Sequence, residues 1–143
     1  MPIRFSIHPD RRLAFFRFEG EVDTSDCANV FEDYISAKGF SPDLVMLSDT
    51  SSLVSINSDY SSILSRLLEL RKSLKVFQRP ILSVIYARSD AIYGMARLLE
   101  QVQNPISNIK IIVCRDQSEA LRLAGQPYTS MQALNDAIES GTN

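Results

Sequence analysis

The chain has 143 residues, 45% of them apolar and 22% charged, which matches the usual size and composition of one globular domain. A chain of this length buries enough surface to form a hydrophobic core without disulfides or a structural metal. Fifteen Lys and Arg residues are interspersed among seventeen Asp and Glu residues and the formal net charge is −2, which argues against a nucleic-acid-binding surface.

The N-terminal part of the chain predicts a hairpin followed by a helix. Residues 3–8 alternate between apolar and polar side chains, and residues 13–18 are apolar and rich in phenylalanine. The short link between them predicts an antiparallel pair of strands. Gly20 is expected to break the second strand, and Asp23 then caps a helix whose apolar residues recur at helical spacing from residue 27 to residue 35.

Next come a buried strand and the longest helix. The apolar run 44–47 predicts an interior strand, and residues 49–56, rich in Ser, Thr and Asp, predict a loop. The longest helix is expected to begin near Asn57 or Ser58. Its apolar residues fall on one face at helical spacing: Tyr60, Ile63, Leu64, Leu67, Leu70 and Leu74.

The second half of the chain repeats the order of strand and helix. The strands are residues 81–87 and 109–114; Ser89 caps the helix after the first, and Asp116 begins the helix after the second. An additional C-terminal helix is expected over residues 128–140. The order predicts an α/β fold with a five-stranded mixed sheet, in which the N-terminal hairpin is antiparallel, the other strands are mostly parallel, and the helices lie largely on one face.

Nothing in the chain suggests secretion or a membrane span. The first residues, MPIRFSIH, lack the apolar segment of a signal peptide, and no apolar run approaches the ~20 residues that a span needs. Two isolated cysteines, Cys27 and Cys114, suit a reducing compartment. We therefore expect a cytoplasmic protein with one domain over residues 1–143.

Several short motifs, in this order, resemble the STAS-type fold of the SpoIIAA-like anti-sigma-factor antagonists and of sulfate-transporter cytoplasmic domains. Gly20-Glu21-Val22-Asp23 is similar to the Gly-Glu-Leu-Asp that follows the second strand there, and residues 44–49 resemble the third strand with its terminal Asp. Residues 90–97 and 115–121 are similar to two helix openings of the uncharacterised SpoIIAA-like branch. The resemblance covers residues 3–124 and implies a regulatory, protein-interacting domain.

The chain departs from those antagonists at the segment that carries their phosphorylated serine. Asn57-Ser58-Asp59-Tyr60 stands where the resemblance expects Asp-Ser-Ser-Gly. Asp59 would occupy the acceptor position, and its fixed charge resembles part of a phosphate. Ser58 is a displaced candidate acceptor. The resemblance therefore implies docking of a protein partner without the usual phosphorylation switch.

The candidate binding residues follow predicted strand ends, where ligands of open α/β sheets bind. We expect the carboxylates of Asp23, Asp49, Asp59 and Asp90 to gather at this edge, where helix capping would explain Asp59 and Asp90 at least as well. Tyr93 and Arg97 share a helix face that could meet an anion, but a solvated face, or an Arg stem that covers apolar surface, is the favoured interpretation. Gly94 lies between them, where close packing would explain a glycine. The candidates are Asp49, Ser51, Ser52, Asn57, Ser58, Asp59, Asp90, Tyr93 and Arg97.

No catalytic set, metal site or cofactor is expected. His8 is the one histidine, and its place on the polar face of a strand indicates a surface role. One His and two separated Cys do not have the spacing of zinc ligands. Cys114 stands beside Arg115, which could activate a thiol, but a small buried hydrophobe is the commoner role for such a cysteine.

Three functions stay open. The first is a non-enzymatic regulatory or protein-interaction domain, and the third, least favoured, is an enzyme using the carboxylates with Arg97. The second is a carrier of a small apolar or lipid-like ligand, for which a cavity of roughly 300 Å³ or more would be evidence. A homodimer through the first strand is also plausible. Aromatic residues could line the carrier's cavity: Phe15, Phe16, Phe18, Phe31 and Tyr34.

Overall fold

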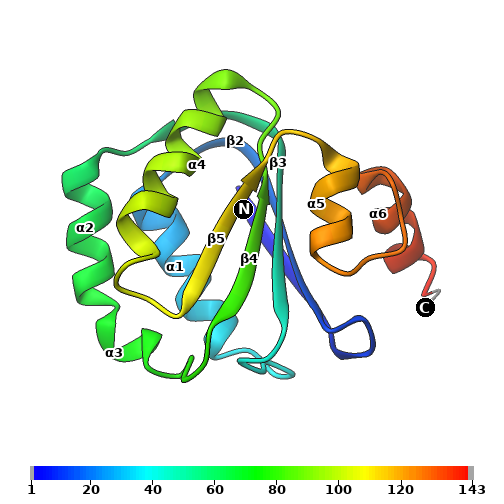
Figure 1. Ribbon diagram of the computed structural model, residues 1–143, viewed down its shortest axis with the longest axis horizontal. Coiled ribbons are helices and arrows are strands. Elements are labelled where there is room, and N and C mark those ends of the chain that lie inside the picture. The colour runs from blue at the N-terminus through cyan, green and yellow to red at the C-terminus, as the bar shows by residue number, and fades with distance from the viewer. Residues whose placement is uncertain (1, 142–143) are drawn as a thin grey trace.

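The computed structural model describes residues 2–141 and shows one sheet with helices on both faces (Figure 1). The strands are β1 (Ile3–His8), β2 (Leu13–Asp23), β3 (Val45–Asn57), β4 (Ile81–Tyr86) and β5 (Ile109–Cys114). The helices are α1 (Thr24–Ile35), α2 (Tyr60–Glu69), α3 (Arg71–Leu74), α4 (Asp90–Gln103), α5 (Gln117–Leu123) and α6 (Met131–Glu139), with a 3-10 turn at Pro9–Arg11.

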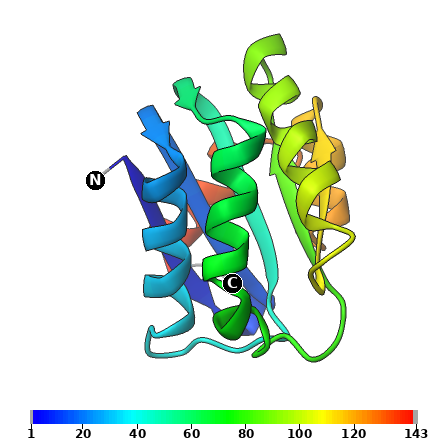
Figure 2. The same cartoon turned by 90° about the vertical axis from the view of Figure 1, so that its left-hand side faces the viewer.

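The strands lie in the sheet in the order in which they follow along the chain, β1-β2-β3-β4-β5. β1 pairs antiparallel with β2, and every later pair is parallel. Because each crossover advances by one strand in the same direction, the crossover helices α1, α2 and α4 lie on one face, as Figure 2 shows. The predicted five-stranded mixed sheet is confirmed.

The other face of the sheet is covered by the last two helices, which follow β5 and connect no further strands (Figure 1). α5 and α6 pack on a tight core in which Leu13, Leu47, Leu121 and Leu134 are fully buried. The predicted C-terminal helix is present as α6, and Ser130 caps it by accepting the Ala133 N–H at 3.1 Å. The sheet therefore separates two distinct packing layers.

β2 does not end at Gly20, as the sequence suggested, but continues to Asp23. Gly20 has φ +70°, a left-handed conformation that favours glycine, and the register with β3 shifts between Arg17 and Glu19 and again between Gly20 and Glu21. The glycine thus permits an irregularity within a long strand rather than ending it.

β3 is also longer than expected, because residues 49–56 form strand and not the predicted loop. Pairing with β4 spans only Met46–Asp49, whereas pairing with β2 runs on to Asn57. The second half of β3 therefore has a strand on one side only. Polar residues suit such an exposed edge, which explains why this segment looked like a loop.

The longest predicted helix is interrupted. α2 begins at Tyr60 behind the N-cap Asp59, ends at Glu69, and is followed by the short α3. Tyr60 was expected on the apolar face, but it is 58% exposed because it stands in the first turn, ahead of the buried positions Ile63 and Leu67. α2 packs mainly against α1 and α4 and lies further from the sheet than either (Figures 1 and 2).

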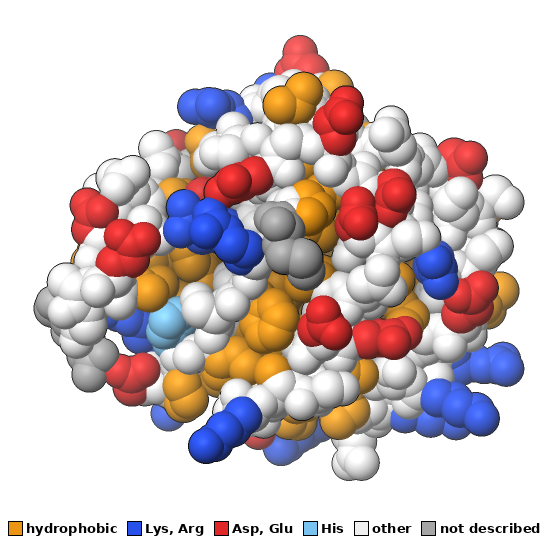
Figure 3. Space-filling model, turned by 180° about the vertical axis from the view of Figure 1, so that it is seen from behind, with side chains coloured by type: hydrophobic (Ala, Val, Ile, Leu, Met, Phe, Trp, Pro, Cys, Tyr) orange, Lys and Arg blue, Asp and Glu red, His pale blue; other side chains and the backbone are white. Residues whose placement is uncertain are grey.

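β1 forms one edge of the sheet, and no strand pairs with its outer side among the described residues. Figure 3 views the molecule from this side and shows apolar side chains at the centre of the face, surrounded by acidic and basic residues.

Within residues 2–141, no helix combines the length and the apolar character needed to cross a membrane.

Candidate functional site

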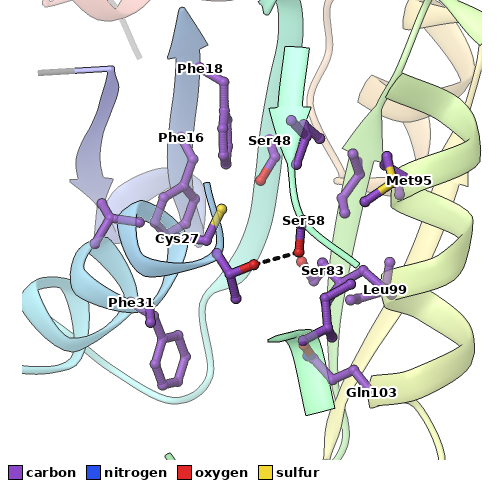
Figure 4. Close-up of a pocket in the computed structure, with 18 of the residues that line it drawn as sticks. Phe16, Phe18, Cys27, Phe31, Ser48, Ser58, Ser83, Met95, Leu99 and Gln103 are labelled. Atoms are coloured by element: carbon purple, nitrogen blue, oxygen red, sulfur yellow. Dashed lines mark hydrogen bonds between the residues drawn. The ribbon is translucent and has the colours of Figure 1, made fainter. Parts of the chain in front are cut away.

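A cavity of about 220 Å³ lies between α2 and the sheet, with α1 and α4 as its side walls. Its lining is overwhelmingly apolar: Phe16 and Phe18 come from β2, Phe31 from α1, and Met95 and Leu99 from α4 (Figure 4). α2 closes the outer side with Ile63 and Leu67, which pack against Val102 and Leu99 of α4. The cavity exists because α2 rests on its neighbouring helices and leaves space above the strands.

Three of the five aromatic residues expected to line a cavity do so, namely Phe16, Phe18 and Phe31. Phe15 points to the opposite face of the sheet, into the core under α5 and α6. Tyr34 is fully buried beside the cavity, with its ring 5.1 Å from that of Phe16 and 4.9 Å from that of Phe40. Alternation along β2 accounts for the split between Phe15 and Phe16.

Two serine side chains stand on the apolar floor of the cavity, Ser48 on β3 and Ser83 on β4 (Figure 4). They are 9% and 8% exposed. In the register of these strands Met46 is opposite Ser83 and Ser48 is opposite Ile85, so the two serines are diagonal neighbours on one face. Across residues 2–141, neither hydroxyl has a hydrogen-bond partner, and neither oxygen is fully enclosed by protein atoms. Thr50, further along β3, instead donates to the Tyr86 carbonyl at 2.6 Å.

Polar contacts join α1 to the start of α2 at one side of the cavity. The hydroxyls of Thr24 and Ser58 are hydrogen-bonded to each other (Figure 4). Arg66, the one charged side chain of the lining within the described residues, donates to Ser25 Oγ at 2.6 Å and to Glu69 Oε2 at 2.9 Å. A polar groove between α1 and α2 shares Thr24 and Arg66 with the cavity, so the two spaces adjoin there.

The first group of sequence candidates lies away from this cavity. Asp49 is in the middle of β3 and points to the face opposite Ser48; its carboxylate accepts the Ser51 N–H at 3.0 Å. The Ser51 carbonyl accepts from Arg88 at 3.3 Å, and Ser52 is exposed on the same strand. These side chains make local contacts of the strand.

The second group surrounds the start of α2. Asn57 ends β3 and is paired in register with Asp23, which forms a reciprocal capping box at α1. Ser58 lies at the cavity through its bond to Thr24. Asp59 caps α2 by accepting the Ser62 N–H at 2.7 Å, and hydrogen bonds from Ser62 hold the pKa of Asp59 below its usual value. The negative charge at this position therefore has a structural role.

The expected gathering of Asp23, Asp49, Asp59 and Asp90 at one edge is wrong in part. Asp23 and Asp59 lie at the ends of the neighbouring strands β2 and β3. Asp49 precedes Asn57 in β3 by the length of six residues of β2, from Arg17 to Asp23, which is roughly 20 Å along an extended strand. The cause is the extension of β3, which carries the strand end far beyond Asp49.

The third group lies on α4 and is engaged in surface contacts. Asp90 is 92% exposed and pairs with Arg115 at 2.6 Å. The guanidinium of Arg115 also lies over the Tyr93 ring, 5.1 Å from its centroid. Arg97 pairs with Glu100 at 3.5 Å on its own helix. Tyr93 thus meets Arg115 and not, as sequence spacing suggested, a site shared with Arg97.

The side chains of His8, Cys27 and Cys114 are partly or largely buried, and burial shifts the pKa of each. His8 Nε2 is 2.7 Å from Ser6 Oγ, and burial, with Arg11 adding to it, lowers the pKa of His8. Cys27 lines the cavity, and burial raises its pKa to about 12. Burial raises the pKa of Cys114 too, as do the nearby carboxylates, so both thiols are protonated at neutral pH. Among residues 2–141, His, Cys, Asp and Glu form no group of three or more that could hold a metal ion.

Sequence reasoning missed the polar part of the lining. Ser48 follows the predicted strand 44–47 at the start of a Ser-rich segment expected to be a loop, and Ser83 falls within the predicted strand 81–87, so neither was a site candidate. A signal existed for Ser83, which is the one serine of the otherwise apolar strand Ile81–Tyr86. Such a residue in an interior strand faces either a hydrogen-bond partner or a space. Ser48 had no such signal, because Thr50, Ser51 and Ser52 follow it in the same strand.

Comparisons with known proteins bear on the fold. No family model and no curated protein matches the chain. Among solved structures, it is similar to an uncharacterised protein of the DUF3478 family from Shewanella loihica PV-4, described as having a SpoIIAA-like fold. The TM-score is 0.52 at 16% sequence identity, and the match covers 85% of this chain and 93% of that one. With the observed strand order and the motifs quoted from the sequence, these findings identify the chain's architecture as a SpoIIAA-like, STAS-type fold.

Proposed function

We propose that this protein binds and carries a small, mainly apolar molecule in the cavity beneath α2. The observation that carries the proposal is the cavity itself, with a volume of about 220 Å³ and walls of Phe, Leu, Ile and Met side chains. Protein interiors are normally filled to the density of organic crystals, so an apolar space of this size is unusual. An occupant would recover the contacts that the lining side chains lack.

The volume sets the size of the occupant. The cavity does not reach the roughly 300 Å³ that was expected of a carrier and at which drug-sized pockets begin, so the proposal is restricted to a smaller molecule. A dry engineered cavity of about 150 Å³ holds benzene. In proportion, 220 Å³ holds about nine non-hydrogen atoms. A substituted aromatic ring or a short branched chain fits this limit, whereas a long acyl chain exceeds it.

The arrangement of helices supports exchange of such a ligand. α2 and α3 cover the cavity without being part of the sheet, and the Thr24–Ser58 hydrogen bond joins their N-terminal side to α1. Leu70, at the junction of α2 and α3, is a C-cap outside regular helix geometry. The cavity is already partly open to solvent, and a movement of α2 would widen it while leaving every strand pairing in place.

The alternative, docking of a protein at the carboxylate edge, has weaker support. That hypothesis needed Asp49 and Asp59 side by side, whereas Asp49 lies well before the end of β3 and accepts from Ser51, and Asp59 follows the strand end as the N-cap of α2. Asp59 is also occupied as a helix cap, so Asp59→Ala would weaken α2 as well as any partner contact. A partner-binding defect in that variant would not identify an interaction surface.

Titration with p-xylene, which has eight non-hydrogen atoms, tests the proposal. In two-dimensional ¹H–¹⁵N spectra we expect saturable shifts at amides of cavity-lining residues on α1, α2 and α4, and a rise in the unfolding temperature. Organic extraction of the purified protein, followed by mass spectrometry, would identify any molecule retained from the cell. Absence of saturable p-xylene binding would refute the proposal.

Two matched variants of α4 show whether binding occurs in the cavity. Ala96 lines the cavity and is 5% exposed, so Ala96→Leu places three further carbon atoms in the space. Ala91 is exposed on the same helix and does not line the cavity, so Ala91→Leu is the control. We expect Ala96→Leu to weaken p-xylene binding at least tenfold and Ala91→Leu to leave it unchanged. Equal binding by both variants would place the ligand elsewhere.

A further inference from the structure

The floor of the cavity carries two hydroxyl groups that the fold itself does not satisfy. Ser48 and Ser83 are more than nine-tenths buried, line the cavity, and have no hydrogen-bond partner among residues 2–141; their oxygens are not fully enclosed, which leaves them open to an occupant of the cavity. Buried polar groups in proteins almost always have a partner, and one left unpaired is destabilising. Alanine at either position would fill the same place on the sheet without that cost.

We propose, on the basis of the binding function above, that the occupant is a neutral molecule with an apolar body and one hydrogen-bonding oxygen, a phenol, alcohol or ketone, whose oxygen lies at Ser48 and Ser83. Each serine hydroxyl can donate and accept, so either a hydroxyl or a carbonyl of the ligand is satisfied. The surrounding Met46 and Ile85, opposite the serines in the strand register, contact the apolar body.

The charges around the cavity favour a neutral ligand. Among the described residues, the lining contains one charged side chain, Arg66, and it already donates to Glu69 and Ser25. A carboxylate at the serines would stand among apolar side chains without a cation. Transfer of an unpaired charge into such surroundings is strongly unfavourable. A hydroxyl or carbonyl needs only the hydrogen bond that the serines offer.

Two probe molecules of the same size and shape, one with an oxygen and one without, measure the contribution of the ligand oxygen to binding. p-Cresol and p-xylene each have eight non-hydrogen atoms and differ by a hydroxyl in place of a methyl, and p-cresol is neutral at pH 7. The measured quantity is the ratio of their dissociation constants, Kd for p-xylene divided by Kd for p-cresol. It is determined in the unmodified protein and in a double variant, Ser48→Ala with Ser83→Ala. Comparing the two ratios cancels the difference in hydration between the probes.

We expect the ratio to fall by about three- to tenfold in the double variant, the effect of one hydrogen bond, while p-xylene binds as tightly as before or more tightly. Ser52→Ala is the control, because Ser52 is an exposed serine of the same strand outside the cavity, and it should leave the ratio unchanged. Benzoate, an anion that stays within the size limit of the cavity, should bind more weakly than p-cresol.

The outcomes separate this inference from the binding function. An unchanged ratio in the double variant, with both probes bound, would overturn the role of the serines and leave the carrier proposal standing; ordered water would then be their partner. Tighter binding of benzoate than of p-cresol would overturn the assignment of a neutral ligand. Failure of both p-cresol and p-xylene to bind the unmodified protein would refute the carrier proposal itself.

Discussion

Tyr34→Phe should stabilise the protein. Tyr34 is fully buried, its ring packs edge-on against Phe16 and Phe40, and its hydroxyl has no hydrogen-bond partner within residues 2–141. Burial raises the pKa of Tyr34, so the group is a neutral phenol at every working pH. Removing an unsatisfied buried hydroxyl recovers about 1–3 kcal/mol, from which the small space left by the oxygen subtracts a few tenths.

The expected net gain is about 1–2 kcal/mol in the free energy of unfolding, or roughly 3–6 °C in Tm. Urea denaturation followed by circular dichroism measures it, with an unchanged m-value as the sign that the same structure unfolds. Tyr128→Phe is the matched control, because the Tyr128 hydroxyl accepts from Arg11 at 3.3 Å and its loss should be neutral or slightly destabilising. A loss of more than about 1 kcal/mol in Tyr34→Phe would show that the hydroxyl has a partner and would refute the reasoning.

Three further predictions concern the helices around the cavity. Gly94→Ala should raise the free energy of unfolding by about 0.5–1 kcal/mol, measured by thermal unfolding, because alanine is the better helix former. A Cβ at this position meets no atom within 4 Å, contrary to the close packing expected from the sequence. A loss of stability would contradict the prediction. Ala96→Leu should raise the free energy of unfolding by about 1–2 kcal/mol, because empty volume in a protein costs about 24 cal/mol per Å³. Destabilisation by this substitution would mean that the space is already filled. Asp59→Asn should reduce the loss of Tm between pH 6 and pH 3. The pKa of Asp59 is lower in the folded protein than in the unfolded chain, so the ionised carboxylate stabilises the fold at pH values above its unfolded pKa. This stabilisation is lost as the pH falls through the folded-state pKa. An unchanged acid loss in the variant would show that other carboxylates govern it.

Much of the fold follows from local patterns of the sequence. Alternation over Ile3–His8 and the apolar run before Ser48 identify strands, and Ser89 and Asp116 cap helices as predicted. The errors occur where tertiary contacts override local preference. Gly20 was read as a strand end although the register shift with β3 accommodates it. A preference for turns at one residue does not show whether the neighbouring strand continues beside it.

The cavity could not be predicted, because it depends on how far α2 stands from the sheet. The apolar face of α2 was visible in the sequence, but its contact with Val102 and Leu99 of α4 was not. The same pattern would describe a helix packed directly on the strands. The separation of Asp49 from Asp59 was missed for a related reason, since the length of β3 is fixed by pairing with β2 and not by its own composition.

The sheet separates a tightly packed layer, formed by α5 and α6, from a layer that contains the cavity, formed by α1, α2 and α4. Behind it, Leu13, Leu47, Leu121 and Leu134 fix α5 and α6 with no exposed area. In front, α2 rests on two helices that have sheet contacts of their own. Under the proposed function, a displacement of α2 on ligand binding would therefore leave the strand pairing and the helices α5 and α6 undisturbed.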